Sequence, residues 1–151
     1  TKLERAPIVV DSQTFMKSVA AEVAREFGDL VTIEEKGPLG ALDYQISFIP
    51  GSPRAAQIVW YTISDTFTIS VSPRLEWRSE EWISFTGDEA VDRELSQHWS
   101  EDLIWRIINS GAQYIRSRSI LPAFLSPSYV MVGDERFNRP HHVVESWDSW
   151  R

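Results

Sequence analysis

Apolar residues at every second position are the feature that most limits what this chain can fold into. They occur twice between residues 30 and 72, as Leu42, Tyr44, Ile46 and Phe48 and then as Phe67, Ile69 and Val71. Because successive side chains of a strand point to opposite faces, this alternation predicts half-buried strands. Further strands are expected over 30–36 and 56–63, since prolines and glycines at 37–40 and 50–53 separate the segments as turns. The charged segments 75–78 and 82–85 are candidates for one or two edge strands.

A different spacing precedes the strands. Phe15, Val19, Val23 and Phe27 follow one another at four-residue steps, which is the repeat of one face of a helix. Asp11 or Ser12 can cap the beginning of this helix, and Gly28 stands where a left-handed residue often ends one. The sequence therefore predicts an amphipathic helix over 12–27.

The helical pattern returns after the strands. Thr86 with Glu89 has the spacing of a capping box, which predicts a short helix to about Gln97. Ser100, followed by Glu101 and Asp102, is a second helix start, because acidic side chains are favourable near the positive end of a helix. Behind it runs an apolar stripe, and Arg116 and Arg118 are expected in the last turn. The stripe consists of Ile104, Ile107, Ile108, Gly111 and Ile115.

These elements define an α+β fold. We expect an N-terminal amphipathic helix, an antiparallel meander sheet of four to six strands, and a long or broken C-terminal helix packed on one sheet face. A length of 151 residues suits a single domain, residues 1–151. Residues 120–151 are expected to form an irregular C-terminal tail packed against it, with one short strand at 129–132.

Several kinds of chemistry lack their signatures. The chain has no cysteine, so it has no disulfide and no thiolate nucleophile. His98, His141 and His142 do not have the spacing of metal ligands. Neither a nucleophile elbow nor a glycine-rich phosphate loop occurs. We therefore expect a protein that is not an enzyme and that has no cofactor and no metal.

Charge and hydropathy restrict the partners. The net charge of −7 argues against nucleic-acid binding, because each phosphate contact requires a lysine or arginine. No apolar run approaches the roughly 20 residues of a membrane span. No N-terminal segment resembles a secretion signal, and the lack of cysteine fits a reducing compartment. The expectation is a cytoplasmic protein that binds neither nucleic acid nor membrane.

The negative charge is concentrated in one segment. Residues 74–102 hold nine acidic and three basic residues, together with Trp77, Trp82, Phe85 and Trp99. Acidic residues interleaved with tryptophan suit a basic protein partner, because the charge steers association and tryptophan is the most enriched interface anchor. The predicted partner-binding residues are Trp77, Glu80, Glu81, Trp82, Asp88 and Glu89.

In size, acidity and layout the chain looks like a cytosolic immunity protein, an antitoxin that blocks the active-site cleft of a bacterial toxin enzyme. Two other functions are open. The chain could be a small-ligand carrier or enzyme, with an apolar pocket between the sheet and the C-terminal helix lined by Tyr44, Phe48, Trp60, Tyr61 and Phe67. It could also be a secretion chaperone. Of Trp77, Trp82, Trp147 and Trp150, one or two are expected to be exposed.

Overall fold

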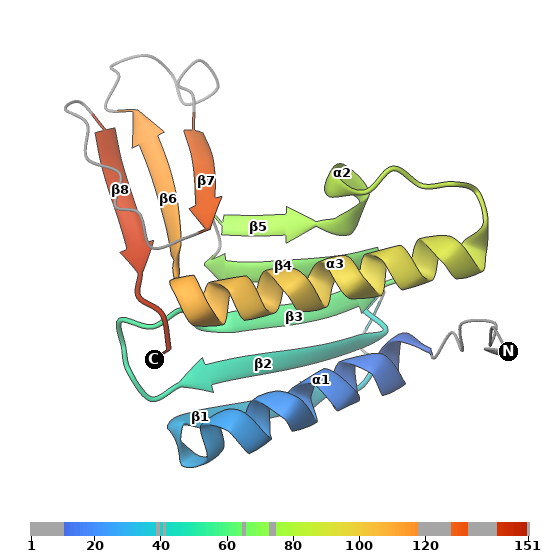
Figure 1. Cartoon of the computed structure of the whole chain (residues 1–151), viewed down its shortest axis with the longest axis horizontal. Helices are drawn as coiled ribbons and strands as arrows, with labels where there is room; N and C mark the ends of the chain where they lie inside the picture. The colour runs from blue at the N-terminus through green and yellow to red at the C-terminus, as the bar shows by residue number, and fades with distance from the viewer. Residues whose placement is uncertain are drawn as a thin grey trace, which may run out of the picture.

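The computed structural model describes residues 11–38, 40, 42–64, 66–72, 75–117, 128–132 and 142–150 (Figure 1). Its helices are α1 (Ser12–Phe27), the short 3-10 helix η1 (Gly28–Leu30), α2 (Ser79–Trp82) and α3 (Glu89–Ser110). Its strands are β1 (Val31–Lys36), β2 (Tyr44–Pro50), β3 (Ile58–Ile63), β4 (Thr66–Ser72), β5 (Leu75–Arg78), β6 (Ala112–Ser117), β7 (Ser128–Val132) and β8 (His142–Trp147).

The first five strands form one antiparallel meander in the order β1-β2-β3-β4-β5. Its register places Ile46 opposite Trp60, and Trp60 opposite Ile69, so that the apolar set of each strand lies on the same face. Helices α1 and α3 both cover that face (Figure 1). The expected α+β fold, with two helices on one side of an antiparallel sheet, is confirmed.

Helix α1 follows the sequence prediction closely. Asp11 caps it, since its carboxylate accepts a hydrogen bond of 2.9 Å from the Thr14 amide, and Gly28 ends it with a φ of 52°. Its apolar face enters the core between sheet and helices, where the Phe15 ring meets Trp60 edge-on at 5.9 Å. The prediction of a helix over 12–27 is therefore confirmed.

The end of α3 differs from the prediction. The helix stops at Ser110, and Ile115 and Arg116 belong to strand β6 rather than to a last helical turn, while Arg118 lies outside the described residues. The cause is Gly111, which has a φ of 77°, and at which a Cβ would collide with the Trp147 carbonyl. The backbone therefore turns out of the helix there, because only glycine tolerates this conformation next to another chain segment.

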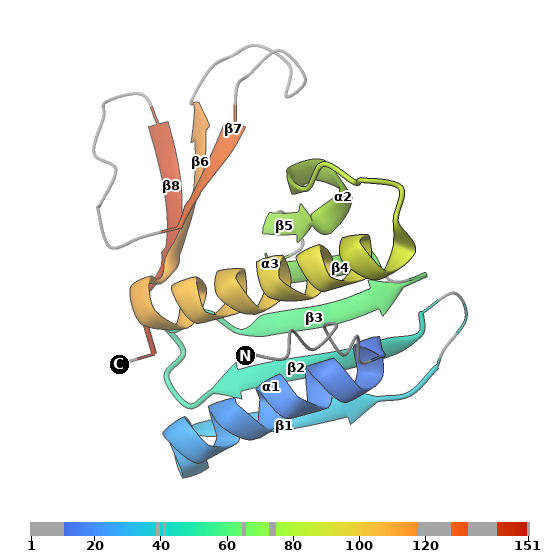
Figure 2. The same cartoon turned by 45° about the vertical axis from the view of Figure 1, so that its right-hand side comes forward.

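Strand β6 is the centre of a second antiparallel sheet, in the order β7-β6-β8. Figures 1 and 2 both show this sheet standing beyond one end of α3. The short strand expected at 129–132 corresponds to β7. Strand β8 was not expected, because residues 120–151 were predicted to form an irregular tail. That the chain is a single domain stays a prediction.

Two further elements of the middle segment differ from expectation. Residues 82–85 do not form an edge strand, because Ser79–Trp82 is a single helical turn. The helix expected to break between Gln97 and Ser100 is continuous from Glu89 to Ser110. Its cap is Asp88 rather than Thr86, since the Asp88 carboxylate accepts hydrogen bonds from the amides of Ala90 and Val91.

The last described residues close one end of the core. The Asp148 amide donates to the Arg54 carbonyl at 2.8 Å, and the Trp150 amide donates to the Ile108 carbonyl at 2.8 Å. The Trp150 indole nitrogen donates to the Ala56 carbonyl at 2.8 Å. The Trp150 ring packs edge-on against Phe27 at 5.2 Å. This segment thus ties together α1, α3 and the loop that precedes β3.

Trp150→Ala should lower the free energy of unfolding by about 2–3 kcal/mol, somewhat less than for a fully buried tryptophan, because the half-buried ring and its hydrogen bond are lost. Urea unfolding measures this. Trp82→Ala is the matched control: its side chain is 64% exposed, and the change should stay within about 0.5 kcal/mol. Equal losses in the two variants would contradict the closing role of Trp150.

Burial, reinforced by the nearby Glu35 carboxylate, raises the pKa of Tyr44 to about 12. The fold favours the neutral phenol, so this group stabilises the protein below its unfolded pKa of about 10 and loses that contribution as the pH rises toward its folded pKa. An ultraviolet titration of phenolate should show a late step that Tyr44→Phe removes. A wild-type titration in which all four tyrosines ionise near their ordinary pKa would contradict this environment.

Candidate protein-binding groove

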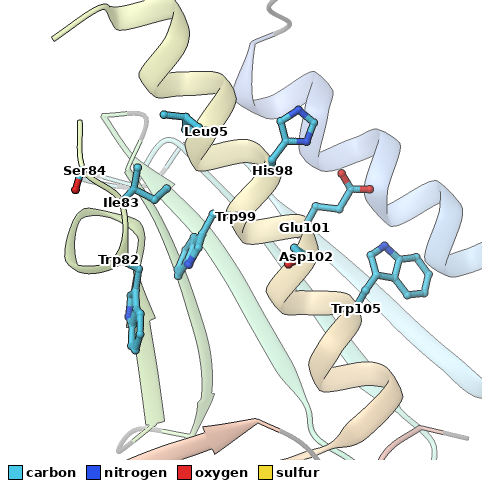
Figure 3. Close-up of a pocket in the computed structure, with 9 residues that line it drawn as sticks. All are labelled: Trp82, Ile83, Ser84, Leu95, His98, Trp99, Glu101, Asp102 and Trp105. Carbon is cyan, nitrogen blue, oxygen red and sulfur yellow. The ribbon is translucent and has the colours of Figure 1, made fainter. Parts of the chain in front are cut away.

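An open groove of about 710 Å³ runs along the outer face of α3 (Figure 3). We call it the α3 groove. Its apolar lining consists of Trp82, Ile83, Leu95, Trp99 and Trp105. Its polar lining consists of Ser84, His98, Glu101 and Asp102. Six of these nine side chains come from α3, so this helix forms the floor, while Trp82 and the two residues after it form one wall.

Helix geometry explains why α3 presents these residues outward. Ile104, Ile107 and Ile108 are fully buried and fix the inner face of the helix against the sheet. Leu95, Trp99 and Asp102 are four and three residues apart, so they share the opposite side, one turn after another. Helix α3 thus carries apolar side chains on both its inner and its outer side. The core fully covers only the inner side, so part of the apolar surface of α3 stays uncovered.

The wall formed by Trp82 is held by the buried residue Ser79. Ser79 is the first residue after β5. Its hydroxyl accepts a hydrogen bond of 3.1 Å from the amide of Phe67 in β4. The Ser79 carbonyl then accepts from the Ile83 amide at 3.0 Å, which closes the turn of α2. The preceding strand buries Trp77 to 5% exposure. The chain thus reverses at this turn and projects Trp82 outward.

Exposed apolar side chains are concentrated in the segment from α2 to the first half of α3, and Trp82 and Leu95 among them line the groove. Among the described residues, six large hydrophobic side chains are exposed, and four of them lie between residues 82 and 95. These four are Trp82, Phe85, Val91 and Leu95. Single exposed apolar residues need no explanation, whereas a cluster of them is typical of an interaction surface.

The loop between α2 and α3 is fixed by two aspartates. Asp92 accepts hydrogen bonds from the amide and hydroxyl of Thr86, at 2.7 and 2.8 Å, and from the Gly87 amide at 3.1 Å. These bonds hold the pKa of Asp92 below its usual range. The Thr86 hydroxyl in turn accepts from the amide of Asp88, the cap of α3. The wall and the floor of the groove are therefore connected by an ordered loop.

The segment that forms the groove is strongly acidic. Residues 79–105 hold eight carboxylates and one arginine, so this segment carries as much net charge as the whole chain, −7. Burial, followed by repulsion from Glu22 and Asp102, raises the pKa of Glu101, and His98 opposes the shift. A cationic partner would relieve the repulsion between these carboxylates. The carboxylates of Glu101 and Asp102 thus lie in the same groove as its tryptophans.

The structure separates the six predicted partner-binding residues. Trp82 lines the α3 groove, and Glu80 and Glu81 are exposed beside it on α2. Trp77 is buried and cannot contact a partner, so its assignment to a surface was wrong. Asp88 is exposed but serves as the helix cap. Glu89 lines a different groove.

Four tryptophans, Trp77, Trp82, Trp147 and Trp150, were candidates for exposure. Trp82 is exposed and the other three are buried or half-buried, which confirms the expectation that one or two are exposed.

Sequence reasoning missed Leu95, Trp99, Asp102 and Trp105 as groove residues. The signal was present for three of them, because Leu95, Trp99 and Asp102 stand opposite the stripe of Ile104, Ile107 and Ile108 on one continuous helix. It was hidden by the helix break expected between Gln97 and Ser100. A helical wheel drawn over 89–110 places these three together and Trp105 to one side of them.

A second groove, of about 390 Å³, lies where the loop after α2 passes the turn between β3 and β4. Phe85, Glu89 and Arg93 contribute to it, and the Glu89 and Arg93 side chains pair at 3.4 Å. It is smaller and carries a partly buried arginine, so it offers less to a basic partner than the α3 groove does.

The five residues proposed to line an apolar ligand pocket do not face one cavity. Phe48, Trp60 and Phe67 have no exposed surface and fill the core, and the Trp60 and Phe67 rings are 5.8 Å apart. Tyr61 follows Trp60 in the strand and points to the opposite sheet face, where its hydroxyl donates to Glu76 at 2.6 Å. These side chains therefore build the core and the open sheet face.

The described residues contain no group of three or more histidine, aspartate or glutamate side chains that could hold a metal ion. No helix in the described ranges is long and apolar enough to cross a membrane. Comparisons with models of protein families, with curated proteins and with solved structures found no match to this chain. The fold and the site thus define an α+β protein with an acidic, aromatic groove on one helix.

Asp88→Ala should lower the free energy of unfolding by about 1 kcal/mol, because two amides at the beginning of α3 lose their acceptor. Chemical denaturation measures the change. Glu89→Ala, which removes a highly exposed carboxylate from its ion pair with Arg93, should cost less than about 0.5 kcal/mol. A loss for Glu89→Ala as large as that for Asp88→Ala would show that Asp88 acts through its charge rather than as a cap.

Proposed function

We propose that this chain is a non-catalytic protein-binding module that takes a basic protein partner in the α3 groove. One observation carries this proposal: the exposed side chains of Trp82 and Leu95 line one groove together with the carboxylates of Glu101 and Asp102, in the most acidic segment of the chain. Aromatic anchors give an interface most of its binding energy, and complementary charge gives it specificity and fast association.

The narrower form of the proposal is an immunity protein, which blocks the basic catalytic cleft of a bacterial toxin enzyme. A cleft that binds a polyanionic substrate is lined by positive charge, so the acidic segment 79–105 is its electrostatic complement. Trp82, exposed on the rim, is a projecting anchor suited to such a cleft. We place this role in the cytoplasm, because the absence of cysteine fits a reducing compartment.

The test compares three immobilised chains in the lysate and secreted fraction of the source cells. These are the wild type, the groove variant Glu101→Lys with Asp102→Lys, and the control variant Asp29→Lys with Glu34→Lys. Both variants change the net charge equally. The control residues are exposed and lie at or next to β1, the sheet edge opposite β5. Circular dichroism first shows that all three are folded.

A protein retained by the wild type and by the control, but lost from the groove variant by tenfold or more, supports the proposal. Retention by all three chains, or by none, contradicts it. The retained protein then tests the narrower form. An enzyme inhibited at a ratio of one to one identifies an immunity protein, whereas a secreted protein without inhibited activity identifies a chaperone.

A further inference from the structure

We infer that Trp82, Trp99 and Asp102 form a binding site for a guanidinium group, supplied by an arginine side chain of the basic partner. The inference rests on the proposed function, because it names the chemical group that the α3 groove recognises. It concerns one end of the groove, where its wall approaches its floor.

The two tryptophans reach this end of the groove from different elements. Trp82 projects from α2, and Trp99 projects from α3 toward the same side (Figure 3). Trp99 is half-buried and packs against the core, so its ring has a fixed position, whereas Trp82 is 64% exposed. Ile83 and Leu95 line the same groove. Two indole faces in a negative field attract a cation through their π electrons.

A carboxylate stands next to the rings. Asp102 follows Trp99 by three residues on the same helix, so the two side chains are surface neighbours. The Asp102 carboxylate already binds a guanidinium, since it pairs with Arg106 at 3.2 Å. Both side chains of this pair are 68% exposed. An ion pair so exposed contributes little to stability, so an incoming arginine can replace Arg106.

Arginine fits this arrangement better than lysine does. A guanidinium is planar and weakly hydrated, so it can stack on an indole face while its edge pairs with a carboxylate. An ammonium is a compact and strongly hydrated charge, and it cannot stack. A neutral apolar group could contact the rings but would leave the negative charge of the groove uncompensated.

The test uses the whole chain, labelled with nitrogen-15, and needs no partner. Acetyl-arginine amide, acetyl-lysine amide and acetyl-citrulline amide are titrated in turn, and the indole N–H signals of the seven tryptophans are followed by NMR. Citrulline is the neutral analogue of arginine and has almost the same shape. We expect arginine to shift the signals of Trp82 and Trp99 selectively, lysine to bind more weakly, and citrulline to leave them unchanged.

Matched variants assign the effect. Trp82→Leu should weaken arginine binding roughly two- to fivefold, which is the range of one exposed cation–π contact. Asp102→Asn should weaken arginine binding as well, while Trp105→Leu, at the far end of the groove, should leave it unchanged. Equal shifts with arginine and citrulline, shifts spread over all seven indoles, or full binding by Trp82→Leu would overturn the inference.

The two proposals fail in different ways. If arginine shifts no indole signal but a protein is retained in a groove-dependent manner, the guanidinium site is wrong and the protein-binding function stands. If arginine binds between Trp82 and Trp99 but no protein depends on Glu101 and Asp102, the guanidinium site stands and the proposed partner is wrong.

Discussion

The packing of Ile104, Ile107 and Ile108 against the sheet determines the rest of the structure. These three side chains have no exposed surface, and they fix both the position of α3 and its rotation about its own axis. With the inner face fixed, helix geometry alone decides which residues point outward, and Leu95, Trp99 and Asp102 are among them. The floor of the α3 groove is thus a consequence of the core.

The outer face of the same helix carries charge that the fold itself does not need. Of the carboxylates around it, Asp88 and Asp92 cap the helix and hold the loop, whereas Glu101 and Asp102 lie in or beside the groove. Burial, followed by repulsion from Glu22 and Asp102, raises the pKa of Glu101, so the fold disfavours its charged form. The proposed basic partner would compensate this charge and cover the exposed Trp82 side chain.

Much of the fold could be predicted from the sequence, because its signals are local. The four-residue spacing from Phe15 to Phe27 and the alternation around Ile46 and Ile69 each depend on a few neighbouring residues. The end of α3 could not be predicted in this way. Ile115 continues the helical spacing, and only the approach of the Trp147 carbonyl to Gly111 shows why the chain leaves the helix. Similarly, nothing near Trp150 in the sequence points to Ala56, its hydrogen-bond partner.

The candidate site was predicted only in its charge and in one of its tryptophans. The alternation of β5 buries Trp77, while the single turn of α2 exposes Trp82, and the two residues look alike in the sequence. Their difference depends on Ser79, whose hydroxyl accepts the Phe67 amide and starts the turn. This contact joins residues twelve apart in the chain, so the composition of the segment does not contain it.

The proposed function requires that the outer face of α3, and not the open face of the sheet, meets the partner. Hydroxyl-radical footprinting of the chain, free and with its retained protein, tests this most directly. The account predicts that oxidation of Trp82, Leu95 and Trp105 falls in the complex, while Tyr61 and Ile63 on the sheet stay as reactive as before. Protection of Tyr61 and Ile63, with the three groove residues unchanged, would contradict it.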